Sequence, residues 1–403
     1  MKKVGMILDG HYPPDVRVEN EALVLIEQGW EVHLLCLQYG KDLPQEEVRK
    51  GIKVHRISCH PLIRKISALA YTLPIYHWFL VKHIKRFIAT FDIDIIHTHD
   101  LQIARAVFWA NKQTRKKHVL DFHENRPEIM KFYKHVNSLM GRLLIYPSVW
   151  KRFEFLYARL TDYLVVVTEQ AKQYYVDSAK IDADKIVVVP NTVSESFYKH
   201  SKIEHQIANK YKEYYTLLYL GDTGKRRGLE TVINALVALR KTIPNIKLVI
   251  VGKSTYDPEL KSLIRDLKLE DQVDHLGWQS VELFPSFIKA CKLGLCPIHK
   301  NLHHETTYAN KVFQTLSMGK PMIVSDCLAQ QKVIEDYQCG LVFKDQDVED
   351  FKDKIMEIYQ DKNLYEQMSK NALDCIDSDF KWEVKSQELV SLYEQIKLAQ
   401  PGG

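Results

Sequence analysis

The sequence predicts an α/β protein made of two doubly wound, Rossmann-like units, and three observations support this class. The chain has 403 residues, and because a domain holds roughly 100 to 200 residues, two or three domains are expected. Short runs that are apolar throughout alternate with segments of helical periodicity, which indicates parallel sheets covered on both faces. This alternation lapses in the polar stretch 194–214 and then resumes, so a boundary is predicted near residue 195.

The elements follow in order from these patterns. The first strand ends at an acid, and Asp15 is placed to cap a helix that begins near Val16. The first series of predicted strands covers residues 4–8, 32–36, 93–97, 119–122, 163–167 and 186–189. The second series covers residues 217–220, 248–251, 273–276, 293–296, 322–324 and 341–343. From residue 347 onward the pattern is helical.

Composition excludes several classes of protein. Hydrophobic residues make up 46% and charged residues 27%, which is typical of a globular protein and not of a disordered or disulfide-rich chain. A net charge of +5 is too small to indicate a nucleic-acid partner. The seven cysteines form no C-x-x-C pair, so we expect reduced thiols in the cytoplasm. No secretory signal is recognised, and the longest uncharged stretch, 66–81, is too short to span a bilayer.

Ligands of doubly wound sheets bind beyond the carboxyl ends of the strands, so residues in the turns that follow strands are candidates for a site. Gly10 permits a tight turn after the first strand, and Arg17 lies in the helix that follows. One hypothesis is therefore that Gly10 and Arg17 contact a ligand. The alternative is an ordinary turn between a strand and a helix.

Histidines and acids follow two further strands of the first unit. His97 and His99 alternate along one strand and so share a face, and His123-Glu124 closes the next strand. These side chains could form a metal site, an acceptor site or a set of buried polar residues. Nothing in their spacing requires the four ligands of a zinc site, so we expect no metal.

The second unit opens with a glycine-rich turn that carries three consecutive cations, Lys225, Arg226 and Arg227, before a helix from Leu229. Glycines let a phosphate approach the backbone, and cations and a helix N-terminus favour anions. This turn therefore indicates a phosphate site, and the alternative is a basic surface turn.

A polar loop after a later strand supplies a second candidate anion site. The loop contains Glu305 and ends at a helix that begins at Asn310 and Lys311. Two such sites in one domain suit a diphosphate.

Taken together, these residues resemble family 4 glycosyltransferases of the GT-B type over essentially the whole chain. No single motif is decisive, but their order and spacing are specific. The matching segments are Pro13-Pro14-Asp15-Val16-Arg17-Val18-Glu19, Gly29-Trp30-Glu31-Val32, Ile96-His97-Thr98-His99-Asp100, Asp121-Phe122-His123-Glu124, Val189-Pro190-Asn191, Arg227-Gly228-Leu229-Glu230, Asn310-Lys311-Val312-Phe313-Gln314 and Met318-Gly319-Lys320-Pro321.

The resemblance implies two Rossmann-like domains facing across a cleft. Residues 1–195 would bind the acceptor, 196–379 the donor, and a final helix, 380–403, would pack back on the first domain. The implied reaction is retaining transfer from a nucleotide diphosphate sugar without a metal or other cofactor. His123 would lie beside the reacting sugar, and Arg227 would grip the diphosphate.

The resemblance also assigns supporting residues. Lys225, Arg226, Glu305, Asn310, Lys311 and Gln314 would bind the donor with Gly10, and Gly277 would lie near the base; Arg17, His97, His99 and Glu124 would lie on the acceptor side. The family often has a basic residue where this chain has Asp222. It also has a second glutamate where this chain has Gln314, whose amide can still bind ribose hydroxyls.

We therefore expect a transferase that moves a sugar, from a UDP-sugar by preference, to a lipid-linked or polysaccharide acceptor in the synthesis of a capsule, lipopolysaccharide or other cell-surface glycan. Two alternatives stay open. A nucleotide-sugar epimerase of the same architecture would need catalytic acids in the cleft. A non-catalytic GT-B subunit would explain the change to Gln314.

Charge is unevenly distributed along the chain. Residues 1–195 hold 28 Lys and Arg against 22 Asp and Glu, and residues 48–91 contain nine Lys or Arg and no acid. Apolar residues at helical spacing in this segment, among them Leu80 and Ile84, lie opposite Lys82, Lys85 and Arg86. Such a helix suits an anionic membrane surface, so we expect contact through residues 62–91 and a peripheral location on the inner face of the cell membrane. The alternative is a core helix with a solvated basic face.

Overall fold

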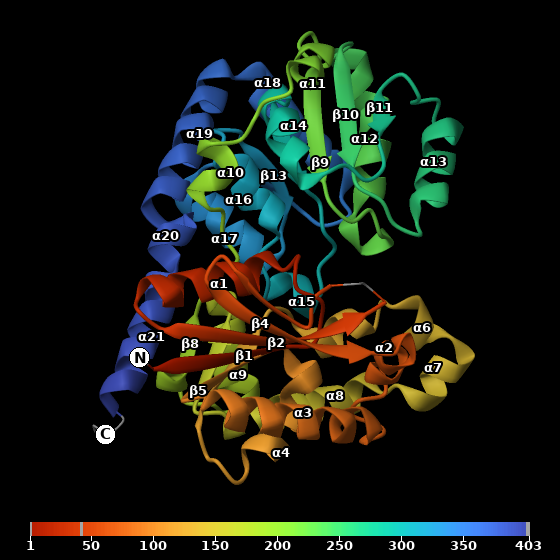
Figure 1. The fold of residues 1–403 in the computed structure, drawn as a ribbon. Coiled ribbons are helices and arrows are strands. Elements are labelled where there is room, and N and C mark those ends of the chain that lie inside the picture. Colours follow the sequence, from red (N-terminus) through yellow and green to blue (C-terminus); the bar gives the residue numbers. More distant parts are fainter. Residues whose placement is uncertain (1, 41–42, 400–403) are drawn as a thin grey trace. The chain divides into compact units, whose positions relative to one another are not determined.

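The computed structural model describes residues 2–40 and 43–399, and this part of the chain divides into two compact units. The first unit comprises the described residues up to Pro190 and from Ser386 onward, and the second comprises Asn191–Lys385. Each unit contains a β-sheet flanked by helices (Figure 1). The predicted α/β class of two Rossmann-like units is confirmed.

The sheet of the first unit has eight strands in the order β3-β4-β2-β1-β5-β6-β7-β8. The strands are β1 (Lys3–Leu8), β2 (Glu31–Tyr39), β3 (Glu46–Arg49), β4 (Ile52–Cys59), β5 (Ile95–His99), β6 (Lys117–Phe122), β7 (Tyr163–Val166) and β8 (Ile186–Val188). The register places Leu8 beside His99 and His99 beside Asp121. The residues that follow β1, β5 and β6 therefore meet at one edge of the sheet.

Helices cover both faces of this sheet, with α1 on one face and α3 and α4 on the other (Figure 1). Asp15 caps α1 as predicted, because its side chain accepts a hydrogen bond from the Val18 N–H at 3.1 Å. The helices are α1 (Val16–Glu27), α2 (Pro61–Ser67), α3 (Ile75–Phe91), α4 (Leu101–Asn111), α5 (Arg126–Met130), α6 (Lys134–Asn137), α7 (Leu139–Leu144), α8 (Pro147–Leu160), α9 (Glu169–Ala179), the 3₁₀ turn η1 (Ala183–Lys185) and α21 (Gln387–Ala399).

The hairpin β3–β4 is absent from the sequence prediction. Strand β4 pairs in parallel with β2, and β3 pairs antiparallel with β4, so the first sheet is not purely parallel. The segment Ile52–Cys59 alternates apolar residues with Lys53, His55 and other polar residues, and much of it is buried in that alternating pattern. A search for runs that are apolar throughout does not detect a strand of this kind.

The second sheet has six parallel strands in the order β11-β10-β9-β12-β13-β14. They are β9 (Tyr215–Leu220), β10 (Ile246–Val251), β11 (Val273–His275), β12 (Leu293–Cys296), β13 (Met322–Ser325) and β14 (Gly340–Phe343). The helices are α10 (Glu195–Lys199), α11 (His205–Lys210), η2 (Lys225–Arg227), α12 (Leu229–Thr242), α13 (Asp257–Asp266), η3 (Val281–Leu283), α14 (Phe284–Ala290), α15 (Leu302–Glu305), α16 (Asn310–Leu316), α17 (Leu328–Tyr337), α18 (Val348–Gln360), α19 (Lys362–Cys375), the π-helical turn η4 (Ile376–Phe380) and α20 (Trp382–Lys385).

The chain crosses between the units at positions slightly different from those expected. The divisions fall after Pro190 and after Lys385, compared with the expected residues 195 and 380. Phe380 stacks on Phe313 with 4.7 Å between ring centroids, and Trp382 N–H donates to the Val193 carbonyl at 2.9 Å. These contacts keep residues 380–385 in the second unit, and only α21 belongs to the first.

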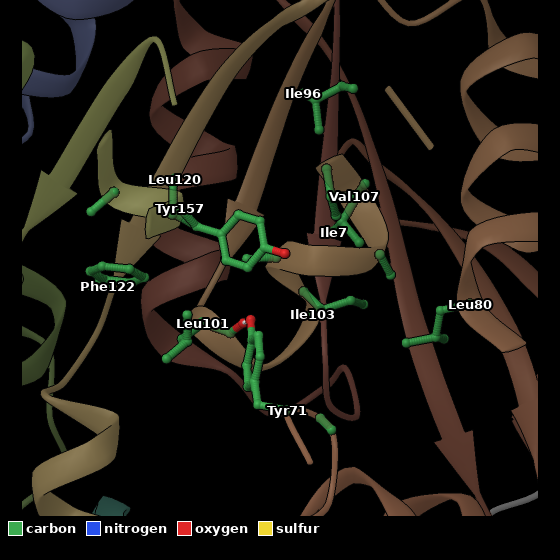
Figure 2. Packing of buried hydrophobic residues seen from close by; sticks show 14 of the residues in the cluster. Ile7, Tyr71, Leu80, Ile96, Leu101, Ile103, Val107, Leu120, Phe122 and Tyr157 are labelled. Atoms are coloured by element: carbon green, nitrogen blue, oxygen red, sulfur yellow. Dashed lines mark hydrogen bonds between the residues drawn. The ribbon is translucent and has the colours of Figure 1, made fainter. Parts of the chain in front are cut away.

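The apolar face of α3 packs in the core of the first unit, which corrects the expectation that this face lies in a membrane. Leu80, Ile84, Phe87 and Ile88 are all nearly inaccessible to solvent. Figure 2 shows Leu80 in one cluster with side chains from the sheet and from α4, including Ile7, Ile96, Leu120, Ile103 and Val107. The alternative of a core helix with a solvated basic face is therefore correct for α3. In the described residues, no helix is both long and apolar enough to cross a bilayer.

Candidate functional site

A glycine turn follows β9 in the second unit. Gly221 has φ +107° and Gly228 has φ +70°, a region that favours glycine. A Cβ at Gly228 would lie 1.7 Å from the Pro297 carbonyl oxygen, so only glycine allows the loop after β12 to pack this closely. The His299 N–H also donates to the Arg226 carbonyl at 2.9 Å. The two predicted anion sites are therefore joined at one edge of the second sheet.

The three cations of this turn have different surroundings. Arg227 Nε lies 3.1 Å from Asp222 Oδ2, and Arg226 Nη2 lies 3.6 Å from the same oxygen. Asp222 is therefore a counter-ion of both arginines. Although burial acts to lower it, the pKa of Arg227 is raised by the adjacent Tyr219 hydroxyl and by Asp222. Lys225 is exposed.

Lys311 is the most unusual cation of the site. It lies in the first turn of α16, its side chain is only 8% exposed, and its Nζ has no hydrogen-bond partner among the described residues. This Nζ lies 3.4 Å from the Tyr219 ring centroid, and a Cβ at Gly221 would lie 3.9 Å from it. Burial lowers the pKa of Lys311 to about 7, although Cys296 acts in the opposite direction. Lys311 thus holds its amino group against the Tyr219 ring, where it makes no hydrogen bond to another described residue.

The other residues predicted for the donor have fewer contacts of their own. Gln314 lies one turn after Lys311 on α16, Asn310 begins this helix, and Glu305 ends the short helix α15. Gly277 follows β11, and its carbonyl accepts a hydrogen bond from the Gly252 N–H at 2.8 Å. With Lys311, five of the predicted donor residues therefore lie in the loops and short helices of the second unit that follow β11 and β12. Gly10 belongs to the first unit.

Arg17, His97 and His99 form a buried network in the first unit with Asp121. Their exposed fractions are 7%, 0% and 0%. Arg17 Nε and Nη2 lie 2.9 and 2.8 Å from the two oxygens of Asp121, and His97 Nδ1 lies 2.9 Å from the Tyr393 hydroxyl of α21. These three side chains were predicted to contact the acceptor. In the structure they are buried, and their contacts include Asp121 and Tyr393.

His123 lies at the edge of this network, with 16% of its side chain exposed. Its Nε2 is 3.0 Å from Asp121 Oδ2, and its Nδ1 is 3.6 Å from Asp100 Oδ2. Burial alone would lower the pKa of His123, but these two carboxylates raise it to about 10. The two carboxylates therefore favour the imidazolium form of His123, which can donate a hydrogen bond.

One group of side chains has the composition of a metal site. Ligand atoms of Glu21, His97, His99 and Asp121 lie within 4.8 Å of one another. The guanidinium of Arg17 contacts both carboxylates, at 2.9 Å for Glu21 and 2.8 Å for Asp121. Burial also raises the pKa of Glu21 to about 8, against the opposing effect of Arg17. Because Arg17 already pairs with both carboxylates, the group fits a divalent ion poorly.

A cavity of about 420 Å³ opens beside the ends of β1 and β2 in the first unit. Of the residues that line this cavity, the sequence analysis singled out Gly10 as a ligand contact. It did not identify the other lining residues, because they come from segments that are far apart in the sequence. Glu124, predicted on the acceptor side, pairs at 2.8 Å with Arg126, which lines the cavity. The other polar and aromatic lining residues include Asp9, His11, Tyr39, Arg64, Gln102, Tyr133, His135 and Trp150.

Two doubly wound units in one chain, with a cation-lined turn at the carboxyl edge of the second sheet, have the architecture of the GT-B fold. The comparisons with known proteins agree. Residues 15–197 match the family model described as Glycosyltransferase Family 4, and residues 200–374 match that described as Glycosyl transferases group 1. The chain belongs to this family of glycosyltransferases and is a transferase enzyme.

Two related proteins align with nearly the whole chain. An uncharacterised glycosyltransferase of Methanocaldococcus jannaschii is 22% identical over 98% of this chain and 100% of its own length. The phosphatidyl-myo-inositol mannosyltransferase of Mycobacterium leprae is 20% identical over 98% of this chain and 97% of its own.

Solved structures share the fold. The sucrose-phosphate synthase of Thermosynechococcus elongatus has a TM-score of 0.81 at 17% identity, covering 99% of this chain and 100% of that one. HepE of Anabaena in complex with UDP-glucose has a TM-score of 0.73 at 14% identity, covering 98% of this chain and 100% of that one.

Proposed function

We propose that this chain is a retaining glycosyltransferase that takes a sugar from a nucleotide diphosphate sugar, with a UDP-sugar as the favoured donor, and transfers it to a lipid-linked or polysaccharide acceptor of the cell surface. The complex of HepE with UDP-glucose supports the choice of donor. The name of the mycobacterial relative, an enzyme acting on phosphatidyl-myo-inositol, supports the choice of a lipid-linked acceptor.

The observation that carries the proposal is the buried Nζ of Lys311, which lies near Arg227 and the glycine turn, contacts the Tyr219 ring and has no hydrogen-bond partner among the described residues. An ammonium group without a partner in the protein interior costs free energy, because burial removes its hydration. A dianionic diphosphate would supply the missing charge and hydrogen-bond acceptors. The site is thus organised for a ligand of this chemistry.

The same cations would also assist the reaction. When the bond between the sugar and the diphosphate breaks, negative charge grows on the leaving phosphate, so fixed cations stabilise the transition state more than the ground state. The imidazolium of His123 cannot remove a proton from the acceptor. Transfer of the acceptor proton to the leaving phosphate, as in retaining attack, is consistent with that charge state.

Replacing Arg227 tests the site. We expect Arg227→Ala to weaken UDP binding by about 10- to 150-fold, because a charge-assisted hydrogen bond contributes about 1.5–3 kcal/mol. Arg227→Lys should restore part of this affinity. Isothermal titration calorimetry with UDP measures both. Arg240→Ala, on an exposed part of α12 whose guanidinium bonds the Lys268 carbonyl, is the control. Unchanged affinity in Arg227→Ala would refute the assignment of the diphosphate site.

We propose that the reaction needs no metal, since Lys311 and the arginines supply the charge that a divalent ion would otherwise bring. Release of UDP from the UDP-sugar is expected to proceed at the same rate, within twofold, after dialysis against EDTA and after addition of Mg²⁺ or Mn²⁺. A loss of activity in EDTA that Mn²⁺ restores would contradict this part of the proposal.

We also propose that the enzyme works in the cytoplasm, bound peripherally to the inner face of the membrane. The support is the basic face of α3, where Lys82, Lys85 and Arg86 are exposed beside Trp78, itself 63% exposed. The protein is expected to sediment with phosphatidylglycerol vesicles at low salt and to be released by 0.5 M salt, as is typical of screened surface charge. Equal sedimentation with phosphatidylcholine vesicles would count against this surface.

A further inference from the structure

The inner part of the cavity in the first unit is lined by hydrogen-bonding groups and aromatic rings. Trp150, 1% exposed, forms part of the wall, and its indole N–H has no acceptor among the described residues. Asp9 and Gln102 are half-buried, and Asp9 accepts a hydrogen bond from the Tyr76 hydroxyl. These groups offer hydrogen-bond donors and acceptors beside aromatic rings, which is the usual chemistry of a sugar-binding pocket.

A cation stands at the outer edge of the same cavity. Arg64 lines the cavity from α2 but is exposed to solvent. The other arginine of the lining, Arg126, is already engaged by Glu124 at 2.8 Å and by the Gln102 side chain at 3.0 Å. Among the described residues, none forms a hydrogen bond with the side chain of Arg64, so this guanidinium can bind an anion at the rim.

Exposed apolar side chains adjoin this rim. Helix α7 exposes Leu139 (79%), Met140 (62%) and Leu143 (59%). A Cβ at Gly141 of α7 would lie 1.9 Å from the carbonyl oxygen of His135, which lines the cavity, so α7 packs directly against the cavity wall. In Figure 1, α2, α6 and α7 lie at the same end of the first unit. Large apolar side chains exposed together on one short helix are a feature of binding surfaces.

The charge around α7 suits an anionic amphiphile. Residues 126–152 hold six Lys or Arg and one acid, Glu128, and Arg142 is the one charged residue within α7. Asp9 is the acid among the lining residues and is half-buried; burial raises its pKa to about 6, and the nearby cations Arg126 and Arg64 act in the opposite direction. A ligand can therefore place hydroxyl groups near Asp9 and its negative charge near Arg64.

We propose that the acceptor is an amphiphile in which a sugar or polyol headgroup is joined through a phosphate to a hydrocarbon chain. The headgroup occupies the cavity beside Asp9 and Trp150, the phosphate binds Arg64, and the chain lies along α7. This inference rests on the proposed function, because it names the class of acceptor for that transferase, and it decides between the lipid-linked and the polysaccharide acceptor.

The test compares three probes below their micellar concentrations. The ester of glucose 1-phosphate with dodecanol carries all three parts, glucose 1-phosphate lacks the chain, and dodecyl glucoside lacks the phosphate. We expect the ester to bind the full-length protein at least tenfold more tightly than either of the others, measured by calorimetry. Phosphatidylglycerol vesicles, added as competitor, separate a lipid-linked acceptor from a general site for membrane phospholipid.

Two sets of variants test the contact of Arg64 with the phosphate and the contact of α7 with the hydrocarbon chain. Arg64→Gln is expected to weaken ester binding about tenfold and to leave dodecyl glucoside unaffected, with Lys65→Gln, the exposed neighbour on α2, as control. The double variant Leu139→Ser/Leu143→Ser is expected to weaken the ester about tenfold and to leave glucose 1-phosphate unaffected. Leu398→Ser, at an exposed leucine of α21, is its control. Unfolding curves show whether each variant is folded.

The inference is overturned if the ester binds no better than glucose 1-phosphate, if neither variant changes its affinity, or if phosphatidylglycerol vesicles displace it completely. UDP binding is measured on the same protein samples in a separate titration. Protein that binds UDP but not the ester would retain the proposed transferase and lose this acceptor. Protein that binds no nucleotide diphosphate would contradict the proposed function itself.

Discussion

Lys311→Met is expected to weaken UDP binding at pH 7 by about 10- to 150-fold, the equivalent of one charge-assisted hydrogen bond. The reason is that Nζ of Lys311 is buried beside Gly221 and Arg227 with no partner among the described residues. Methionine keeps much of the side-chain volume and removes the charge. The same substitution is expected to raise stability by about 2–4 kcal/mol, because the folded protein no longer buries an ammonium group.

The pH dependence of stability follows from the depressed pKa of Lys311. In the unfolded chain its pKa is about 10.4, and in the folded protein it is about 7. Between these values the unfolded state carries a proton that the folded state lacks, so stability rises with pH. The penalty is fully present below pH 7 and is lost above about pH 10.4. Compared with Lys311→Met, the natural protein should therefore gain stability between pH 7 and pH 10.

Binding of a diphosphate should also restore the proton to Lys311. At pH 8, UDP binding is expected to take up most of one proton, which calorimetry in buffers of different ionisation enthalpy measures directly. Lys311→Met should abolish this uptake, whereas Lys241→Met, at an exposed lysine of α12, should preserve it. Full UDP affinity in Lys311→Met, with the proton uptake intact, would show that this lysine does not bind the diphosphate.

His123→Gln is expected to lower kcat by about 10²–10³-fold while UDP affinity stays within twofold. Glutamine can still donate a hydrogen bond, but it lacks the positive charge that Asp100 and Asp121 maintain on His123. A fixed charge beside the reacting groups is expected to act mainly on the transition state. Asp121 keeps its two contacts with Arg17 in this variant, so we expect the protein to fold.

The pH profile distinguishes this role from that of a general base. Because the pKa of His123 is about 10, kcat of the natural enzyme should show no limb from this group between pH 6 and pH 8.5. His200→Gln, at an exposed histidine of the second unit, is the control. A limb near pH 6.5 that disappears in His123→Gln would indicate a neutral histidine acting as base and would contradict the assignment.

The fold could be predicted well where strands are buried on both faces. Strands such as β1 and β9 are continuous apolar runs, and a run of this kind has few other stable arrangements. Strand β4 was missed because its residues alternate between buried and less buried positions. The apolar face of α3 illustrates a second limit. Its spacing is the same whether the face lies in a membrane or in a core, and only the fold places Leu80 against β1, β5 and α4.

The candidate site could be predicted in part for a related reason. Residues that follow strands, such as Arg227 and His123, can be located from the order of strands alone. The burial of His97 could not, because Tyr393, almost 300 residues later, covers it from α21. The burial of Lys311 without a hydrogen-bond partner among the described residues likewise depends on its neighbours Tyr219 and Gly221, which are distant in the sequence. The cavity of the first unit could not be predicted either, because its lining combines residues of α2 and α6, which are distant in the sequence.

The most direct test is the release of nucleotide diphosphate from a panel of UDP-, GDP- and ADP-sugars, with each variant assayed beside the natural protein. We expect slow release of UDP from at least one UDP-sugar without any acceptor, with the rate reduced at least tenfold in both Arg227→Ala and Lys311→Met. If no sugar nucleotide is turned over, or if both variants act at the natural rate, the account of this site as the donor site of a glycosyltransferase is contradicted.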